Sequence, residues 1–277
     1  MPKILVTGAN GQLGSELRAI SSEYAYTFYF TTSKELDITD HDKVAAFCAD
    51  NHIDTIINCA AYTAVDKAEA ERKSADLVNR KAVKKLAKIS REHAIKLIHI
   101  STDYVFDGKH FKPYREAFHT NPNSVYGQSK CDGEAAMIQI NPTHSIIIRT
   151  SWIYSYYGAN FVKTMLKLGR EKASLGVIYD QVGTPTYAKD LAKAILDIIP
   201  KIQNKNVEIY HYSSEGVTSW YDFAKEIMRM AKLDCKINPI ETYQYPTPAK
   251  RPHYSVLNTS NIKKEFGIEI PYWKDSL

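Results

Sequence analysis

Two residues that can move protons, Tyr126 and Lys130, stand four positions apart in the segment Tyr-Gly-Gln-Ser-Lys. If this segment is helical, the phenol and the ammonium lie on one face. A fixed positive charge beside a phenol favours the phenolate and lowers a pKa that is ordinarily about 10. Such a tyrosine can exchange a proton with a carbonyl or alcohol oxygen near neutral pH. In a chain with 19 tyrosines the spacing alone is weak evidence, so its meaning depends on the surrounding elements.

A glycine-rich segment near the N-terminus, residues 8–14, supplies a context for that pair. It follows an apolar run, Ile4–Val6, and precedes a helical pattern over Gln12–Ile20. In the order strand, turn and helix, backbone N–H groups and the positive end of the helix point at a pyrophosphate. The alternative is an ordinary tight turn. We predict a dinucleotide site formed by Gly8, Asn10, Gly11, Gln12, Leu13 and Gly14.

The end of the second expected strand bears on the choice between the two nicotinamide cofactors. Many NAD sites carry an acidic residue there, about 20 residues after the turn, which binds the adenosine ribose. Here the strand ends in Thr31-Thr32-Ser33-Lys34, and we expect no carboxylate at its tip. The hydroxyls and Lys34 suit a 2′-phosphate, unless Lys34 is only a solvated surface charge. NADPH therefore fits at least as well as NADH.

Two further segments are expected to contact the cofactor. Asp37 is placed to accept from the adenine amino group while Ile38 packs on the ring. Alternatively, Asp40 or Thr39 caps the following helix, which is compatible with the first role. Residues 58–61, Asn-Cys-Ala-Ala, end another strand with small side chains that let a cofactor lie across the sheet edge. This predicts that Ala60 and Ala61 lie beside the cofactor.

Short apolar runs alternate with helical patterns over the first 150 residues. Continuous apolar runs are typical of strands covered on both faces, as in a parallel sheet. Alternating strands and helices with right-handed crossovers predict an α/β fold with a doubly wound parallel sheet of Rossmann type. The expected strands are Ile4–Val6, Tyr26–Phe30, Thr55–Ile57, Leu97–Ile100 and Ile146–Ile148, and the expected helices are Gln12–Ile20, Asp42–Asp50, Ser74–Glu92 and Ser129–Ile140.

The pattern loosens after Trp152. The expected elements are helices over Asn160–Lys172, Tyr187–Ile199 and Ser219–Lys232, a strand over Val207–Tyr212, and a stiff proline-rich loop over residues 245–252. We predict an NAD(P)-binding domain over residues 1–150. A smaller, mainly substrate-binding lobe is expected over residues 151–277, with segments that return to the main sheet.

Composition limits the classes of protein to consider. Hydrophobic residues make up 44% and charged residues 24%, which is typical of a globular protein. The net charge of +5 is spread along the chain, which favours an anionic small molecule over nucleic acid. Four cysteines without metal-ligand spacing indicate reduced thiols. No apolar run nears the ~20 residues that cross a bilayer, and no charged leader precedes the first strand, so we expect a cytoplasmic protein without membrane partners.

The segment Ser101-Thr102-Asp103-Tyr104-Val105-Phe106 ends the strand before Tyr126. Ligands of open α/β sheets bind at the carboxyl ends of strands, where the Thr102 hydroxyl can donate to a substrate oxygen as charge develops. The alternative is a hydroxyl that only caps the strand end. Thr102, Tyr126 and Lys130, together with the glycine turn, resemble the extended short-chain dehydrogenases/reductases.

The resemblance narrows to the dTDP-4-dehydrorhamnose reductase family. It extends from Ile4 to about Trp273 and rests on residues 101–106, on Ala-Ala-Tyr-Thr-Ala-Val-Asp-Lys-Ala-Glu at 60–69, on Arg-Thr-Ser-Trp at 149–152 and on Arg251-Pro252. Related dehydratases carry an acidic pair after the threonine, whereas here Asp103 is followed by Tyr104. The resemblance implies reduction of the 4-keto group of dTDP-4-dehydro-L-rhamnose to dTDP-L-rhamnose, by hydride transfer from NADPH or NADH.

The resemblance also implies roles for individual residues. Tyr126 supplies the proton, Lys130 lowers the tyrosine pKa and holds the nicotinamide ribose, and Thr102 polarises the carbonyl. Asn79 either holds a helix-bending water that relays protons to Lys130 or is a polar surface residue. From the residues alone, Trp152 is a core or interlobe aromatic and Arg251 a solvated loop residue. The family implies a sugar pocket with Thr102, Asp103, Tyr104 and Trp152, Arg251 on the diphosphate, and Tyr62, Tyr126 and Lys130 at the cofactor.

Two features depart from the family pattern. The family often forms dimers with a divalent ion such as Mg²⁺ held by carboxylates at the interface. Glu16 and Asp190 fall at those positions without metal-ligand spacing, so the residues themselves predict no metal site. The family continues with a closing helix after the tryptophan, whereas this sequence stops at Leu277, and we expect that helix to be missing or curtailed.

Two other functions stay open. One is a different NAD(P)-dependent sugar-nucleotide reductase or epimerase, which the pocket residues decide. The other is a non-catalytic nucleotide-binding regulatory subunit. Against the second, Thr102, Tyr126 and Lys130 are all present.

Overall fold

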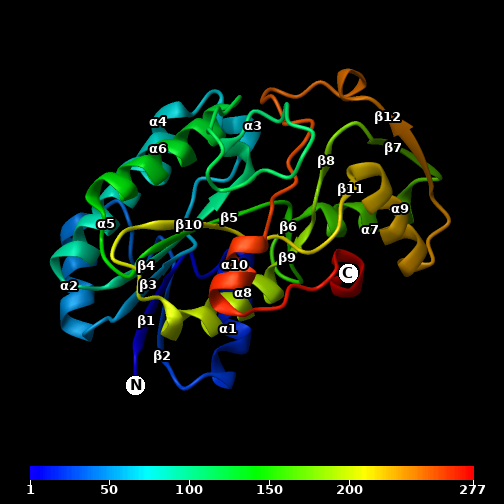
Figure 1. The fold of residues 1–277 in the computed structure, drawn as a ribbon. Coiled ribbons are helices and arrows are strands. Elements are labelled where there is room, and N and C mark those ends of the chain that lie inside the picture. The colour runs from blue at the N-terminus through cyan, green and yellow to red at the C-terminus, as the bar shows by residue number, and fades with distance from the viewer.

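A six-stranded, all-parallel sheet forms the centre of the computed structural model, which describes residues 1–277 (Figure 1). Its strand order is β10-β5-β4-β3-β1-β2, so the chain reverses direction across the sheet after β2. This confirms the doubly wound, Rossmann-type fold. The strands are β1 (Lys3–Thr7), β2 (Thr27–Thr31), β3 (Thr55–Asn58), β4 (Lys96–Thr102), β5 (Ile146–Thr150) and β10 (Glu208–His211).

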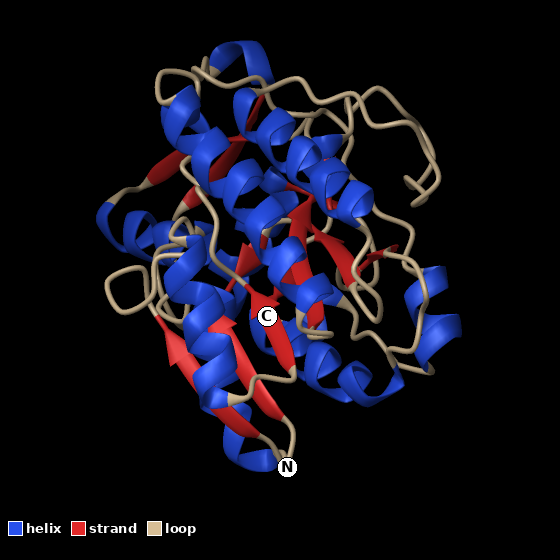
Figure 2. Cartoon of the chain, turned by 90° about the vertical axis from the view of Figure 1, so that its left-hand side faces the viewer, coloured by secondary structure: helices blue, strands red, loops and turns tan.

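Helices cover both faces of the sheet because alternate strand residues point to opposite sides. Ile4 and Val6 pack into one buried cluster, whereas Leu5 between them packs into the other. Figure 2 shows the strands enclosed between helices. The first face carries α1 (Gln12–Ile20), α8 (Ala188–Ile198) and α10 (Ser260–Phe266), and the second carries α2 (His41–Asn51), α5 (Val83–Glu92) and α6 (Val125–Ile140).

Two expected helices differ in detail from the structure. The helix expected over Ser74–Glu92 consists of α4 (Arg72–Asp76), a π-helical turn η2 (Leu77–Ala82) and α5. The helix expected from Ser129 begins at Val125, because the Ser124 side chain accepts the Gly127 N–H and caps the first turn. A further short helix, α3 (Val65–Ala68), lies in the connection after β3.

The C-terminal part builds a third buried cluster beside the sheet, on the right in Figure 1. The helices α7 (Phe161–Glu171) and α9 (Trp220–Ala231) pack with the parallel pair β7 (Ser174–Ile178) and β12 (Lys236–Ile240). Residues 245–252 contain no helix or strand, as their prolines predict. The remaining strands and α-helix are β6 (Ile153–Tyr154), β8 (Val182–Gly183), β9 (Thr186–Tyr187), β11 (Thr218–Ser219) and α11 (Trp273–Ser276).

All four cysteines carry free thiols, as their spacing predicts. None of the helices combines the length and the hydropathy that crossing a bilayer requires.

Candidate active site

The glycine turn brings backbone closer than any side chain allows. Gly8 has φ of +66°, and a Cβ there would lie 2.7 Å from the Ala60 backbone. A Cβ on Gly14 would lie 2.6 Å from the Gly8 carbonyl oxygen. Gly11 is the N-cap of α1 and supplies no side-chain cap, and no acidic residue stands in the first turn. The N–H groups at this helix end therefore fit a pyrophosphate.

The tip of β2 differs from the sequence expectation, because a carboxylate lies there. The backbone N–H and the hydroxyl of Thr32 both donate to Glu35 Oε2, each at 2.8 Å. These bonds hold the pKa of Glu35 below its ordinary value, and Arg18 contributes in the same direction. We expected no carboxylate at the tip of β2, and this was wrong. The turn after β2 brings Glu35, the fourth residue after the strand, back to the strand end. Glu35 occupies the Thr32 groups that we assigned to a 2′-phosphate.

The segment from Asp37 to Asp40 ends in a helix cap. Asp40 accepts the Lys43 N–H and caps α2, as the alternative predicted. Asp37 is exposed, and its carboxylate accepts the Thr39 N–H at 2.9 Å. Ile38 is buried in the cluster beneath α2 and α5, so little of its side chain is left to pack on a ring.

Asn79 ties the loop after β3 to α6. Its amide accepts the Tyr62 N–H at 2.9 Å and donates to the Tyr62 carbonyl at 3.0 Å and to Ser129 Oγ at 2.9 Å. Asn79 lies in the π-helical turn and is 1% exposed, so the surface-polar alternative was wrong. The amide fixes the segment that contains Ala60 and Ala61 against the helix that carries Tyr126.

Tyr126 and Lys130 lie on α6 as predicted, but they do not interact in the expected way. The surrounding protein raises the pKa of Tyr126 to about 12, chiefly through burial. A hydrogen bond with Thr102 opposes this rise, and the charge of Asp103 adds to it. The prediction of a lowered tyrosine pKa was wrong for this arrangement, because burial determines the shift and the Lys130 amine points toward the sheet. Its Nζ donates to the Ile100 carbonyl at 2.5 Å.

The Lys130 amine is itself perturbed. The side chain is 2% exposed, and burial lowers its pKa to about 8. The charge of Glu134, one turn along α6, acts in the opposite direction. Lys130 is therefore an amine that exchanges its proton much closer to neutral pH than an exposed lysine does.

Thr102, Asp103 and Tyr104 gather beside Tyr126 at the carboxyl end of β4. The Thr102 hydroxyl donates to Asp103 Oδ1 at 3.0 Å and accepts the Tyr104 N–H at 3.2 Å. The Tyr104 ring lies edge-on to the Tyr126 ring, with 5.5 Å between centroids. Asp103 Oδ2 is buried without a hydrogen-bond partner, and burial raises the pKa of this carboxyl to about 6. The structure thus brings four of the predicted site residues together.

Trp152 follows β5 in a strained conformation. Its φ of +46° falls in the left-handed region, which a bulky residue rarely adopts. The indole stacks on Trp220 of α9, with 3.5 Å between centroids and 8° between planes. Trp152 therefore links the sheet to the C-terminal cluster, as an interlobe aromatic does.

Arg251 is not a freely solvated loop residue. Its guanidinium donates to both carboxylate oxygens of Asp66, at 3.0 and 2.7 Å, and Asp66 also accepts the Ala249 N–H. This pair joins the proline-rich loop to α3 across 185 positions in the chain. In Figure 1 the orange segment after β12 runs over the top of the molecule to reach this region.

The two carboxylates that the resemblance placed at a metal each contact a hydroxyl. Glu16 accepts from Ser155 Oγ at 2.6 Å, and Asp190 accepts from Ser276 Oγ at 2.5 Å. Burial raises the pKa of the Tyr187 phenol, and the charges of Glu16 and Asp190 act in the same direction. No group of three or more histidine, cysteine or acidic side chains converges in the structure.

Sequence reasoning missed two polar clusters beneath α6. In one, Arg149 forms a buried ion pair with Glu134, at 2.6 Å, and Ser101 donates to the same carboxylate. The other runs through Thr7, Asn58 and His99 to Lys130. The sequence did contain a signal for these clusters, namely polar residues within or at the end of otherwise apolar strands. Buried polar groups need hydrogen-bond partners, so such residues indicate a buried polar cluster.

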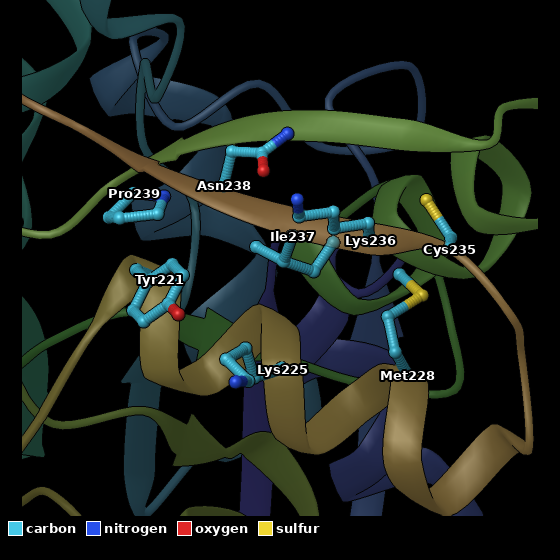
Figure 3. Close-up of a pocket in the computed structure, with 8 residues that line it drawn as sticks. All are labelled: Tyr221, Lys225, Met228, Cys235, Lys236, Ile237, Asn238 and Pro239. Carbon is cyan, nitrogen blue, oxygen red and sulfur yellow. The ribbon is translucent and has the colours of Figure 1, made fainter.

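A recess of about 370 Å³ lies between α9 and β12, away from these residues (Figure 3). Figure 3 shows Tyr221, Lys225 and Met228 on the helix facing the strand that carries Ile237. No predicted site residue lines it, so this recess is separate from the candidate active site.

Comparisons with known proteins agree with the motifs. A family model described as the RmlD substrate binding domain matches residues 2–277. A dTDP-4-dehydrorhamnose reductase from Aggregatibacter actinomycetemcomitans is 42% identical over 287 residues, covering 100% of this chain and 97% of the relative. A crystal structure of a dTDP-4-dehydrorhamnose reductase from Clostridium acetobutylicum has a TM-score of 0.94 and 42% identity, covering 99% of this chain and 96% of the other.

A second solved structure bears on the cofactor. The dTDP-4-dehydrorhamnose reductase from Bacillus anthracis, in complex with NADP, has a TM-score of 0.94 and 37% identity and covers 100% of this chain and 97% of the other. The fold, the glycine turn and these similarities, which span whole chains, confirm the resemblance seen in the motifs. The chain belongs to the dTDP-4-dehydrorhamnose reductase family.

Proposed function

We propose that this chain reduces the 4-keto group of dTDP-4-dehydro-L-rhamnose to dTDP-L-rhamnose with NADPH or NADH. The family membership supports the reaction and the nucleotide-sugar substrate. The observation that carries it is the meeting of Thr102, Asp103, Tyr104 and Tyr126 at the carboxyl end of β4. Ligands of this fold class bind at that edge.

The bound nicotinamide cofactor supplies the hydride, and the chain supplies the proton and the positioning. With a pKa of about 12, Tyr126 is a neutral phenol at pH 7 and holds the proton that the sugar oxygen requires. Thr102 lies beside Tyr126 and is the donor that polarises the same oxygen, for which its hydroxyl must turn away from Asp103 Oδ1. Lys130 is the buried amine that holds the nicotinamide ribose.

The cofactor is assigned to the first 150 residues. The glycine turn would hold the pyrophosphate, and the close backbone contacts of Gly8 and Gly14 leave no room there for side chains. Asn10, Gln12, Leu13 and the loop at Ala60–Tyr62 are the further cofactor contacts that we propose. Asp37 remains a candidate for the adenine amino group, with Ile38 beside it.

The nucleotide sugar is assigned to the edge between the sheet and residues 151–277. Asp103 presents a buried carboxylate beside the hydroxyls of Thr102 and Ser255, with Oδ2 outside the protein's hydrogen-bond network, which suits a sugar hydroxyl. Tyr104 and Trp152 offer ring faces and edges to the sugar. Arg251 binds the diphosphate, for which it must share or leave its contact with Asp66.

One assay tests the reaction and its nearest rivals. The purified chain is mixed with dTDP-4-dehydro-L-rhamnose and each nicotinamide, the absorbance at 340 nm is followed, and the product is identified by mass and NMR. We expect cofactor oxidation with one dTDP-L-rhamnose formed per cofactor consumed. Epimerisation would change the sugar without net oxidation, and an inert mixture that still binds NADPH would favour a regulatory subunit.

We further propose that the chain is a homodimer in the cytoplasm. The family resemblance supports the dimer, and the four free thiols suit a reducing compartment. Glu16 and Asp190 are the residues that a Mg²⁺ ion at the interface would use. Sedimentation equilibrium with and without EDTA tests the assembly, and a monomer under both conditions would contradict it.

A further inference from the structure

A buried row of polar side chains crosses three neighbouring strands of the sheet. Thr7 of β1 is in register with Asn58 of β3, and Asn58 is in register with His99 of β4. All three are at most 1% exposed. Thr7 is two residues after Leu5 on β1, so both side chains point to the same face of the sheet, beneath α5 and α6. Asn58 and His99 are in register with Thr7 and point to that face as well. Such a row is costly to bury unless each group has a partner.

The partners in the row select one form of His99. The Thr7 hydroxyl donates to Asn58 Oδ1 at 2.7 Å, which directs the amide nitrogen of Asn58 at His99 Nδ1, 3.0 Å away. An amide nitrogen only donates, so Nδ1 accepts and carries no proton. The neutral imidazole therefore bears its proton on Nε2.

The protonated Nε2 faces the amine of Lys130. The two nitrogens are 3.4 Å apart, and the Lys130 Nζ donates to the Ile100 carbonyl at 2.5 Å. A neutral amine can accept from Nε2–H, whereas an ammonium would meet another donor there. We propose that His99, held in one tautomer by Asn58 and Thr7, is a positioning residue that seats Lys130 and disfavours its ammonium form.

Burial is the largest cause that disfavours the ammonium form of Lys130, and the charges of the neighbouring side chains act in the opposite direction. Glu134 favours the ammonium, but its carboxylate is already paired with Arg149. Cys59 also faces the amine, and burial raises the pKa of its thiol to about 12, so the thiol is neutral at pH 7. Burial lowers the pKa of Lys130 to about 8 and that of His99 well below its ordinary value, which agrees with a neutral imidazole.

The consequence for catalysis rests on the proposed function. Tyr126 must regain a proton after each turnover, and Lys130, whose amine points at the Ile100 carbonyl and not at the phenol, can supply it only through an intervening water or hydroxyl. The row sets how readily Lys130 does so. His99 itself touches neither substrate nor cofactor in this account.

Two uncharged substitutions remove the selection of the tautomer without touching Lys130. Asn58→Leu removes the donor to Nδ1, and Thr7→Val lets the Asn58 amide turn over. In both, the proton of His99 can move to Nδ1, and Nε2 then accepts from the ammonium. Ile147→Val is the matched control, because Ile147 is in register with His99 on β5 but takes no part in the row.

The midpoint of Lys130 is measured by NMR titration of labelled lysine in the purified full chain, with Lys130→Met to assign the signal. We expect a wild-type midpoint near 8, a rise of at least about one pH unit in Asn58→Leu, and a smaller rise in Thr7→Val. Equal midpoints in wild type, Asn58→Leu and the control would overturn the proposal.

A second measurement needs no variant. The imidazole ¹⁵N shifts of wild-type His99 report which nitrogen is protonated, and we expect Nε2; protonation of Nδ1 would overturn the proposal. Neither measurement requires turnover, so an inactive enzyme would refute the proposed function and leave this test intact. In an active enzyme, the part of the pH–activity profile that depends on the ionisation of Lys130 should shift by the same amount as the midpoint of the Lys130 titration.

Discussion

Asp103→Asn tests whether the ionised carboxylate of Asp103 in the candidate site lowers the stability of the folded chain. The pKa of this buried carboxyl rises from 3.8 to about 6 in the folded chain. Between these values the unfolded chain has lost the proton while the folded chain keeps it, so stability falls as pH rises through this window. Above it the loss is complete and amounts to about 3 kcal/mol. Asparagine has no such window, and it keeps the oxygen that accepts from Thr102.

Urea unfolding from pH 4.5 to 7.5 measures this difference. The free energy of unfolding of Asp103→Asn, relative to wild type, should increase by about 2 kcal/mol over that range, because part of the window lies below pH 4.5. Any penalty from burying the new amide hydrogens is the same at every pH, so the change with pH is the diagnostic quantity. Asp234→Asn, at an exposed loop position, is the control for the loss of one charge. Parallel curves for wild type and Asp103→Asn would refute the reasoning.

Three other substitutions test the cofactor and substrate assignments. Glu35→Ala removes the carboxylate at the β2 tip and should raise the ratio of kcat/KM for NADPH to that for NADH severalfold; an unchanged ratio would show that Glu35 does not read the ribose. Asp66→Asn releases Arg251 and should tighten dTDP binding in calorimetry, whereas Asp76→Asn, which breaks a similar pair elsewhere, should not; equal affinities would remove Arg251 from the diphosphate site. Gly14→Ala places a Cβ 2.6 Å from a turn carbonyl and should weaken NADPH binding at least about tenfold in a fluorescence titration, and wild-type affinity would contradict the close-approach argument.

The elements of the sheet could be predicted because their signals are local. Continuous apolar runs gave β1, β3, β4 and β5 to within one or two residues, and the order of strand, glycine turn and helix located α1. The gathering of Thr102 and Tyr126 followed from placing a strand end beside a helix. These inferences need only the periodicity of the chain and the general geometry of a parallel sheet.

What could not be predicted depends on which distant residues become neighbours. The row of Thr7, Asn58 and His99 exists only once the strand order and register are known. The pairing of Arg251 with Asp66 spans most of the chain. Burial raises the pKa of Tyr126, and the Lys130 amine points toward a strand carbonyl instead of the phenol, so the expected lowering of the tyrosine pKa is absent.

Tyr126→Phe tests the central claim most directly. Phenylalanine keeps the ring beside Tyr104 and removes only the hydroxyl that carries the proton. Turnover of dTDP-4-dehydro-L-rhamnose, followed by the decay of NADPH absorbance at 340 nm, should fall by about 10²-fold or more, while NADPH still binds as it does to wild type. Turnover at the wild-type rate would show that Tyr126 is not the proton donor and would contradict the assignment of the site.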